Sequence, residues 1–341
     1  MTALCATSAR APLVSVVIPV RNDAGNLARC LKAIREQSGA SSIEIIVADN
    51  GSTDSSRDVA RSFGATVLQM PDVPVSTLRN AGLRLARGQV VALIDADNEI
   101  SEGWLEAALP HFQNSRVAAI GYDYSPPPSG TWVQRLYDAF RYHPSAVQRV
   151  RWLATGNMAV RRGAALEIDG FDETLETCED FDFCNRLRLQ GYEILADPRL
   201  KSTHYGDPAT LEDLFKGELW RGRDALRVGL RGLNAWSELP SLLFPLVALM
   251  SIAAGLVSVA LAWPVGAHLL WWTAGSVALV SALSCLRAIR MFTRARDRRI
   301  GIFPGLWTVA FVYDIARALS PIVRTPHRHA IASHERNRAT A

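Results

Sequence analysis

The stretch Val90-Val91-Ala92-Leu93-Ile94-Asp95-Ala96-Asp97-Asn98 places two aspartates directly after a run of apolar residues. An uninterrupted apolar run of this length predicts a strand that is buried on both faces. Hard carboxylate oxygens suit Mg2+ or Mn2+, and a metal of this kind can in turn hold a diphosphate. The stretch therefore predicts a divalent-metal and diphosphate site where the strand ends. The structural alternative is that the two aspartates only cap a helix.

The composition points to more than one kind of segment. The chain has 341 residues, of which 49% are hydrophobic and 21% charged, and its mean hydropathy is +0.07. Charged residues are common up to Glu238 and absent from Leu239 to Leu286. The formal net charge of +4 is modest, and no basic stripe is interleaved with aromatic residues, so nucleic acid is not an expected partner.

Three other classes of site lack the residues that they need. No Gly-x-Gly-x-x-Gly follows the first expected strand, which disfavours a dinucleotide-dependent oxidoreductase. The five cysteines form no Cys-x-x-Cys pair, so a zinc site is not expected, and their scatter suggests reduced thiols. The long apolar segments lack charged residues at their centres, which disfavours a transporter.

Strands and helices alternate over the first hundred residues. The expected strands are 13–20, Ile43–Ala48, Thr66–Met70 and the run that ends at Asp95, and the expected helices are Asn26–Gln37, Ser55–Phe63 and Thr77–Arg87. This alternation predicts an α/β fold with a mostly parallel sheet. Ligands of such sheets bind beyond the C-terminal strand ends, where Val20–Asp23, Asp49–Gly51 and Asp95–Asp97 are expected to gather.

The middle of the chain is less regular. The segment Trp132–Leu153 is amphipathic and rich in aromatic residues and arginine, which suits either a helix that covers the sheet or a surface that touches lipid or acceptor. A strand is expected at Glu193–Ala196 after a helix at Phe183–Gln190. Residues 209–236 resemble a basic helical connector.

Two segments are long and apolar enough to span a bilayer. Leu239–Trp263 and Val265–Leu286 each exceed twenty residues without Lys, Arg, Asp or Glu, and the short link between them makes a hairpin. A basic run follows at Arg287, Arg290, Arg294, Arg296, Arg298 and Arg299. By the positive-inside rule this end faces the cytoplasm, which also places the N-terminal domain there. The expected location is the cell inner membrane, with more than one span.

The last apolar segment, 302–323, is ambiguous. It carries Asp314 and Arg317 and has basic residues on both sides, so an interfacial helix is expected and a third span is the alternative. The predicted organisation is thus a catalytic domain over 12–236, a transmembrane hairpin over 239–286 and a basic cytoplasmic segment over 287–341.

From about Val14 to Tyr205 the chain resembles family 2 glycosyltransferases, which have the GT-A fold. The resemblance implies a Rossmann-like catalytic domain with a mostly parallel sheet, here followed by transmembrane helices. The matching motifs, in the order of the family, are Val16-Val17-Ile18-Pro19-Val20-Arg21-Asn22, Ile45-Ile46-Val47-Ala48-Asp49-Asn50-Gly51-Ser52-Thr53-Asp54, Arg79-Asn80-Ala81-Gly82, Asp95-Ala96-Asp97, Thr155-Gly156-Asn157, Gly170-Phe171-Asp172-Glu173 and Glu179-Asp180-Phe181-Asp182.

The resemblance also implies roles on the donor side. The residues implied to bind the nucleotide-sugar are Pro19, Val20, Arg21, Asn22, Asp23, Asp49, Asn50, Gly51, Arg79 and Asp95. Among them, Asp49 would hydrogen-bond the base and Arg79 would lie over the nucleotide. Asp97 would bind Mn2+ or Mg2+ directly, with Asp95 near the ribose and His204 completing the metal site. The alternatives are turn chemistry for Asp49, a solvated helix charge for Arg79 and a purely structural His204.

On the acceptor side, the resemblance implies that Asp180 is the base that takes the proton from the acceptor hydroxyl. Glu179 and Asp182 would orient neighbours or cap the helix that starts at Phe183. Residues expected to border the acceptor or the diphosphate are Trp152, Gly156, Asn157, Trp220, Arg221 and Arg223. Processive members carry Gln-x-x-Arg-Trp near Trp220, whereas this chain has Trp-Arg and no such Gln, which argues against polymerisation. A basic helix that faces lipid headgroups is the alternative for this segment.

The sequence thus predicts an inverting, metal-dependent glycosyltransferase at a membrane. It would move a sugar from a nucleotide-diphosphate sugar to a hydroxyl of a lipid-linked or cell-envelope glycan acceptor, with membrane lipids as further partners. One alternative is a polyprenyl-phosphate glycosyl synthase, whose anionic acceptor needs no strong base. The other is a non-catalytic, membrane-anchored nucleotide-binding assembly protein.

Overall fold

The computed structural model describes residues 14–39, 42–231, 239–295 and 299–323. The chain divides into two compact units, which are treated in turn. The sheet unit comprises residues 1–123, 144–174 and 183–203, and the helical unit comprises residues 124–143, 175–182 and 204–341. The predicted domain 12–236 therefore supplies both units, and its two boundaries lie outside the described residues, as do Arg296, Arg298 and 324–341.

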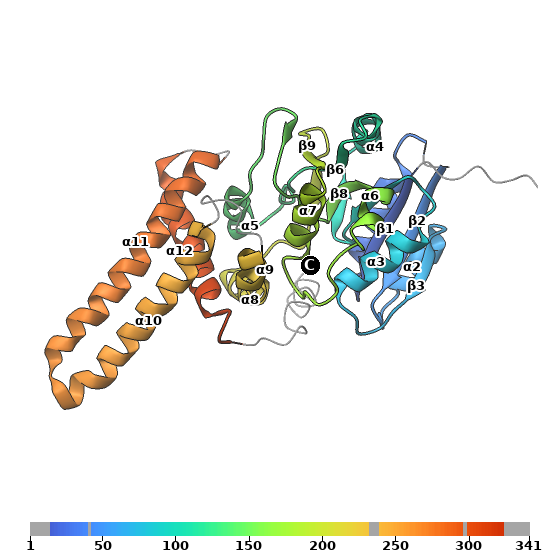
Figure 1. Ribbon diagram of the computed structural model, residues 1–341. Helices are drawn as coiled ribbons and strands as arrows, with labels where there is room; N and C mark the ends of the chain where they lie inside the picture. Colours follow the sequence, from blue (N-terminus) through green and yellow to red (C-terminus); the bar gives the residue numbers. More distant parts are fainter. Residues whose placement is uncertain (1–13, 40–41, 232–238, 296–298, 324–341) are drawn as a thin grey trace, which may run out of the picture. The chain divides into compact units, whose positions relative to one another are not determined.

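The sheet unit is built on a mixed, mostly parallel sheet, as the alternation predicts (Figure 1). The strands are β1 (Val14–Val20), β2 (Ile43–Asp49), β3 (Thr66–Gln69), β4 (Val90–Ile94), β5 (Asn98–Ile100), β6 (Val117–Gly121), β7 (Gln148–Arg149), β8 (Asn157–Arg161), β9 (Glu193–Ala196) and β10 (Ser202–His204). Eight of them lie in the order β3-β2-β1-β4-β8-β6-β9-β7, and β5 pairs with β10. Strands β1 to β4 pair in parallel, and β8 runs antiparallel to both β4 and β6.

The register brings the polar clusters to one edge of the sheet. Val20 of β1 lies opposite Asp49 of β2, and Asp49 lies opposite Gln69 of β3. On the other side of β1, Val17 lies opposite Leu93, so β4 ends close to the level at which β1 ends. Every residue of β4 is buried, as the uninterrupted apolar run predicts. The turn with Asp95 and Asp97 follows at this same edge.

Helices cover the sheet. Those of the sheet unit are α1 (Ala24–Arg35), α2 (Ser56–Ser62), α3 (Val75–Leu85), α4 (Trp104–Ala108), η2 (Leu109–Gln113), α6 (Arg162–Glu167) and the part of α7 (Glu179–Leu189) from Phe183 onward. The helical spacing of Leu27, Leu31 and Ile34 places all three in the core. Gly82 lets α3 approach β1 closely, because a Cβ there would lie 2.3 Å from a methyl carbon of Val17.

The helical unit holds the remaining helices. They are α5 (Trp132–Tyr137), η3 (Asp138–Phe140), the first turn of α7, α8 (Leu211–Arg221), α9 (Ala225–Arg231), α10 (Leu239–Val265), η5 (Ala267–Leu269), α11 (Leu270–Arg294), η6 (Ile300–Ile302) and α12 (Phe303–Leu319). Helix α12 packs against α5, α8, α10 and α11. An apolar cluster at its N-terminal half includes Leu214 of α8, Ala288 of α11 and Leu306 of α12.

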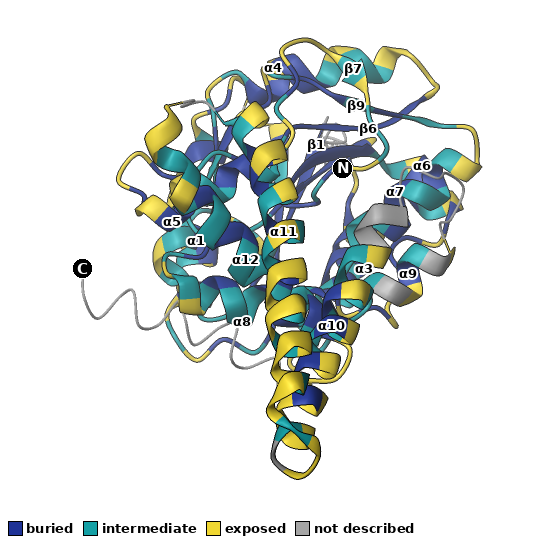
Figure 2. Cartoon of the chain, turned by 90° about the vertical axis from the view of Figure 1, so that its left-hand side faces the viewer, coloured by how far each residue is buried: buried dark blue, intermediate teal, exposed yellow. Residues whose placement is uncertain are grey.

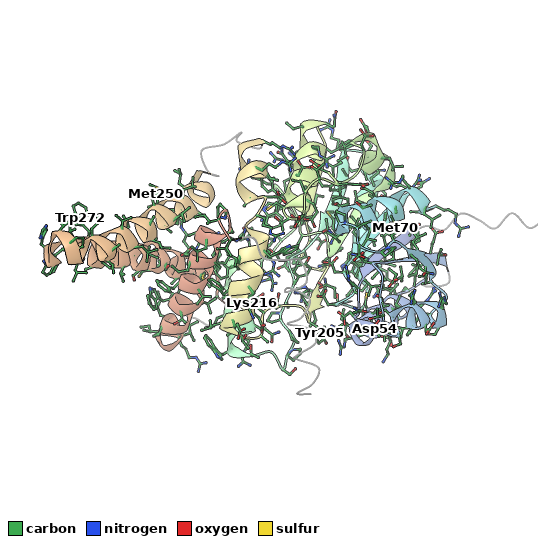
Figure 3. The ribbon with its side chains drawn as sticks, turned by 90° about the horizontal axis from the view of Figure 1, so that it is seen from below. Asp54, Met70, Tyr205, Lys216, Met250 and Trp272 are labelled. Atoms are coloured by element: carbon green, nitrogen blue, oxygen red, sulfur yellow. The ribbon has the colours of Figure 1, made fainter. Side chains whose placement is uncertain are left out.

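Helices α10 and α11 form an antiparallel hairpin. Small side chains let the two helices approach: Gly255 faces Ser276, and the hydroxyls of Ser258 and Thr273 lie 2.6 Å apart. Such small-residue contacts are typical of helices that pack in lipid. Toward the tip, apolar side chains are exposed, including Trp271 (80% exposed) and Trp272 (70% exposed). Figure 2 shows the exposed end of the hairpin, and Figure 3 labels Trp272 there.

Among the described residues, three C-terminal helices are long and apolar enough to cross a membrane: 243–262, 267–294 and 300–319. The first two correspond to the predicted hairpin, although α11 continues to Arg294 instead of ending at Leu286. The third is α12, whose two charged residues are paired: Arg287 donates to Asp314 at 2.7 Å, and Arg317 donates to Glu218 at 2.8 Å. Because these charges are neutralised within the helical unit, they do not by themselves prevent α12 from crossing a bilayer.

Two expected helices have different bounds. The amphipathic segment Trp132–Leu153 is helical only as far as Phe140, so a single covering helix is a wrong prediction. Pro144 accounts for this, because a proline disfavours helical backbone at the residue before it. Helix α7 begins at Glu179, four residues before Phe183. Glu179 and Asp182 therefore belong to its first turn and are not caps before a helix that starts at Phe183.

Candidate active site

Asn22 joins the loop after β1 to the loop after β2. Its backbone is left-handed (φ 51°), which asparagine tolerates better than most residues. Its Oδ1 accepts the backbone N–H of Thr53 at 2.7 Å, and its own N–H donates to Ser52 Oγ at 3.0 Å. The Asn22 side chain, which was expected to bind nucleotide, is thus used to hold the two loops together.

Asn50 does the same between the loops after β2 and β3. Its amide exchanges two hydrogen bonds with the backbone of Val73, at 3.0 and 3.2 Å. The neighbouring Gly51 is left-handed (φ 72°) and lies against Pro71, where a Cβ would come within 3.1 Å. Asp49 is fully buried and accepts the N–H of Ser52 at 3.3 Å. Turn chemistry is therefore present, and a contact between Asp49 and a nucleobase stays a prediction.

Arg79 is a buried partner of Asp95. Its side chain is 5% exposed, and its guanidinium donates to Asp95 Oδ1 at 2.8 Å. The same guanidinium lies 5.8 Å from the centre of the Phe171 ring. The alternative of a solvated helix charge is therefore wrong. The pair fixes the orientation of Asp95, whose own N–H is tied to Gly156 O at 3.2 Å.

Asn80 links two of the quoted motifs, a role that the sequence analysis missed. Its Oδ1 accepts the N–H of Phe171 at 2.8 Å, and its Nδ2 donates to Phe171 O at 2.9 Å and to Glu173 at 2.8 Å. Gly170 is left-handed (φ 71°), and a Cβ there would lie 2.2 Å from Asn80 Oδ1. The sequence signal for this role was the asparagine next to Arg79. Its partner, Phe171, lies about ninety residues further along the chain, so the signal did not reveal the contact.

Several carboxylates gather near the C-terminal end of β4. Burial raises the pKa of the Cys30 thiol, and the charges of Asp97, Asp95 and Asp23 raise it further, as does Glu99. Arg79 pairs with one of these carboxylates, Asp95. Within the described residues, no group of three or more His, Cys, Asp or Glu side chains is placed to hold a metal. Two carboxylates do fit a hard cation such as Mg2+, which usually takes its remaining ligands from substrate phosphates and water.

His204, in the helical unit, is fixed by a carboxylate. Its Nδ1 lies 2.7 Å from Asp207 Oδ1, and its ring stacks on Tyr124 with centroids 4.8 Å apart. Burial favours the protonated form of Asp207, but Arg141 and His204 hold its pKa well below the usual range. Because that carboxylate can only accept, Nδ1 carries the proton. A carboxylate behind the ring is also the usual arrangement of metal-binding histidines, so the predicted role of His204 stays a prediction.

The acidic motif forms the first turn of α7. Glu179, Asp180 and Asp182 all lie where the helix dipole favours negative charge. Asp180 Oδ1 accepts the N–H of Phe181 at 2.7 Å. The residue before the helix, Cys178, has a left-handed backbone (φ 60°), and its carbonyl accepts the N–H of Asp182 at 3.1 Å. The role of Asp180 as base stays a prediction.

The Asn157 side chain holds backbone groups of other segments. It is fully buried, and its amide accepts from Trp104 Nε1 at 2.8 Å and donates to Tyr122 O and Leu200 O at 2.9 and 2.8 Å. These bonds use the amide to join strands and loops, and the place of Asn157 at the border of an acceptor pocket stays a prediction. Of the other residues expected there, Gly156 is buried and Trp152 is exposed.

Both arginines that were expected to face the diphosphate are paired with carboxylates. Arg221 donates to Glu218 at 2.9 Å, and Arg223 donates to Glu176 at 2.5 Å. Glu218 is fully buried and also accepts from Tyr137 and Arg317, at 2.7 and 2.8 Å. A contact between either arginine and a diphosphate stays a prediction. Trp220 precedes them at the end of α8 and is partly buried.

Comparisons with known proteins agree with the fold. Residues 15–168 match the model of the family described as glycosyl transferase family 2. Glycosyltransferase AglE of Haloferax volcanii is 26% identical over 228 residues, which are 64% of this chain and 74% of that protein. The pre-mycofactocin glycosyltransferase of Mycobacterium tuberculosis is 30% identical over 259 residues, 71% of this chain and 53% of that protein. The chain thus spans about half the length of the second relative.

A solved structure shares the architecture. The mannosyltransferase PcManGT of Pyrobaculum calidifontis, solved in complex with GDP-Man and Mn2+, superposes with a TM-score of 0.58 at 18% identity. The match covers 92% of this chain and 88% of that one. At this identity the likeness shows the fold alone. Together with the family model it confirms the predicted α/β fold and the resemblance on which the predicted site residues rest.

Proposed function

We propose that this chain, which carries a family 2 glycosyltransferase domain with the GT-A fold, is an inverting, metal-dependent enzyme that acts at a membrane. It would move a sugar from a nucleotide-diphosphate sugar to a hydroxyl of a lipid-linked or cell-envelope glycan. The observation that carries the proposal is the turn after β4. There Asp95 is oriented by a buried arginine, and Asp97 follows two residues later at the binding edge of the sheet.

Asp97 and Asp95 would hold Mn2+ or Mg2+, and His204 would complete the site. The supporting observation is the gathering of carboxylates at this edge, one of which, Asp95, is paired with Arg79. The metal would supply positive charge to the diphosphate as it leaves the sugar. The Arg79–Asp95 pair would then hold the Asp95 carboxylate in one orientation. The reaction would therefore require less reorganisation of this group.

Asp180 would take the proton from the acceptor hydroxyl as that oxygen attacks the anomeric carbon. Single displacement needs this base on the face opposite the leaving group, and the product then has the inverted configuration. Cys178 is two residues away, but burial and the charge of Asp180 raise the pKa of its thiol to about 12. Because that thiol stays protonated at neutral pH, Cys178 would not form a covalent sugar intermediate.

The hairpin of α10 and α11 would anchor the protein in the inner membrane. Its exposed tryptophans and small-residue helix contact suit lipid. Arg287, Arg290 and Arg294 near the end of α11 would face the cytoplasm by the positive-inside rule. An enzyme anchored in this way meets a lipid-linked acceptor by diffusion in the plane of the membrane.

A donor screen tests the proposal. Purified full-length protein in detergent would be heated with UDP, GDP, dTDP or CMP, each with and without Mn2+. One nucleoside diphosphate should raise the melting temperature, only with metal, and Asp97→Ala should abolish that rise. The matching sugar nucleotide should then give transfer to a hydroxyl acceptor. Transfer to polyprenyl phosphate would identify the synthase alternative instead, and no response to any nucleotide would favour a non-catalytic assembly protein.

A further inference from the structure

The loop that leads into α7 is fastened to the turn between α8 and α9. One carboxylate oxygen of Asp224 accepts the N–H groups of Glu176 and Thr177, at 2.9 and 3.1 Å. In return the N–H of Asp224 donates to Thr177 Oγ1 at 3.2 Å, and Thr177 is buried. Arg223 adds an ion pair with Glu176 at 2.5 Å. Four contacts thus hold the residues directly before the acidic motif.

This fastening sustains an unfavourable backbone conformation. Cys178 has φ 60°, a left-handed conformation that is unfavourable for a residue with a Cβ. Strain of this kind persists only where surrounding contacts determine the conformation. The Cys178 thiol lies 3.9 Å from Arg221 O, so the residue is held from the same turn of α8. The left-handed residue sets the direction in which α7 starts, and hence where Asp180 lies.

The C-terminal end of α12 fixes that turn of α8. Arg317 donates to Glu218 at 2.8 Å and to the backbone oxygen of Arg221 at 3.1 Å. Gly222 fits against Ser320 of α12, where a Cβ would come within 2.2 Å of the Ser320 hydroxyl. Burial favours protonated Glu218, but the charges of Arg317 and Arg221 keep its pKa below the ordinary value. The ion pair is therefore intact at neutral pH.

We propose that Asp224 and Arg317 are positioning residues for the base of the reaction, acting through the loop 175–178. Asp224 holds the loop 175–178. Arg317 holds the end of α8, and the turn that carries Asp224 follows directly after it. Asp180 then keeps its place only while α12 is docked, which makes catalysis depend on a membrane-associated helix that need not touch either substrate. The inference rests on the proposed function, because it takes Asp180 as the base.

The first experiment measures the loop without relying on activity. Hydrogen–deuterium exchange of the full-length protein in nanodiscs would follow peptides that cover 175–183. Asp224→Ala and Arg317→Ala should each raise exchange there at least about tenfold, because their hydrogen bonds no longer hold the backbone. Asp224→Asn should restore protection, since its amide oxygen can accept both N–H groups. Unchanged exchange in folded Asp224→Ala would overturn the proposal.

The second experiment measures transfer with the donor found in the screen. A displaced base lowers kcat by about 10- to 100-fold and leaves the KM for the donor unchanged. Asp224→Asn should recover most of the loss, and Arg317→Lys, which keeps one charge for Glu218, should recover part of it. The exposed residues Glu212 and Arg290 give matched controls, Glu212→Gln and Arg290→Met, which should behave like the wild type.

The outcomes separate the two proposals. If the wild type transfers no sugar, the proposed function fails, while the exchange experiment still decides whether α12 and Asp224 hold the loop. If transfer occurs and Asp224→Ala raises the donor KM with kcat unchanged, the residue serves donor binding and the positioning role is wrong. If Arg317→Ala does not fold, Arg317→Lys and Asp224→Ala carry the test.

Discussion

The two units use their polar side chains in different ways. In the sheet unit, neutral amides hold backbone: Asn22, Asn50, Asn80 and Asn157 each bond to main-chain groups of a distant segment. In the helical unit, charged side chains form ion pairs with one another, as Asp207 does with Arg141 and Glu218 with Arg317. Loops must be fixed in direction, which an amide does at little cost. A charge among apolar helices must instead be neutralised before it can be buried.

This contrast implies different responses to mutation. The donor side is expected to lose chemistry while the fold survives, whereas the ion pairs of the helical unit are expected to carry stability. Four substitutions test the contrast, beginning with the largest effect.

Asp97→Ala should abolish metal-dependent transfer, by about 1000-fold or more, because the carboxylate proposed to hold the metal is lost. Its melting temperature should stay within about 2 °C of the wild type, since a partly exposed turn residue holds little of the fold. Transfer assays and thermal unfolding of the same preparation check both parts. The exposed Asp72→Ala is the control, and retained activity in Asp97→Ala would refute the metal assignment.

Glu218→Ala should destabilise the helical unit by about 3–5 kcal/mol, because it removes a fully buried carboxylate that the partly buried Arg221 and Arg317 share. Denaturant unfolding in detergent measures the change. The control is Glu212→Gln on the exposed face of the same helix, where a surface ion pair is worth at most about 1 kcal/mol. A loss for Glu218→Ala no larger than that of the control would show that the buried pair contributes little.

Asn80→Ala should cost about 1–3 kcal/mol, because the buried N–H and C=O of Phe171 lose their partner. Exchange should rise in peptides around 170–173, and transfer should fall less than in Asp97→Ala. The same unfolding measurement applies. If stability is unchanged but transfer is lost, Asn80 acts on substrate and not on the fold. That result would weaken the contrast in which the amides of the sheet unit hold backbone.

The acid response of Asp207 gives the smallest effect. Its pKa is lower in the folded protein than in the unfolded chain, so the folded state binds fewer protons. The ionised Asp207 carboxylate stabilises the fold fully when the pH is above about 4, the ordinary pKa of an aspartate. This stabilisation is lost as the pH falls below that value. Stability measured between about pH 7 and pH 3 should therefore decline less steeply in Asp207→Asn than in the wild type, from a lower starting value. Parallel curves would contradict the assignment.

Much of the sheet unit could be predicted from local patterns. The strand expected at 13–20 is Val14–Val20, and the helix expected at 26–37 is Ala24–Arg35. Apolar runs and helical spacing are local signals, and they place each strand end where its polar cluster lies. The partners of Asn80 and Arg79 are set by chain topology instead, which no local pattern contains.

The helical unit was harder to predict. Aromatic spacing suggested one helix over 132–153, but Pro144 prevents it from continuing that far. The arginines of α8 were expected to meet a diphosphate, although Glu218 three residues before Arg221 was a readable signal of an ion pair. The second partner of Glu218, Arg317, lies about a hundred residues further along and could not be read from spacing.

The pairing of Asp314 bears on how the chain is made. Its carboxylate is bonded by Arg287 and by the hydroxyl of Ser284, both on α11. During synthesis α11 precedes α12, so the partners of Asp314 leave the ribosome first. A carboxylate enters an apolar environment at low cost only when its partners are in place. We therefore expect α12 to pack onto the hairpin only after α11 has formed.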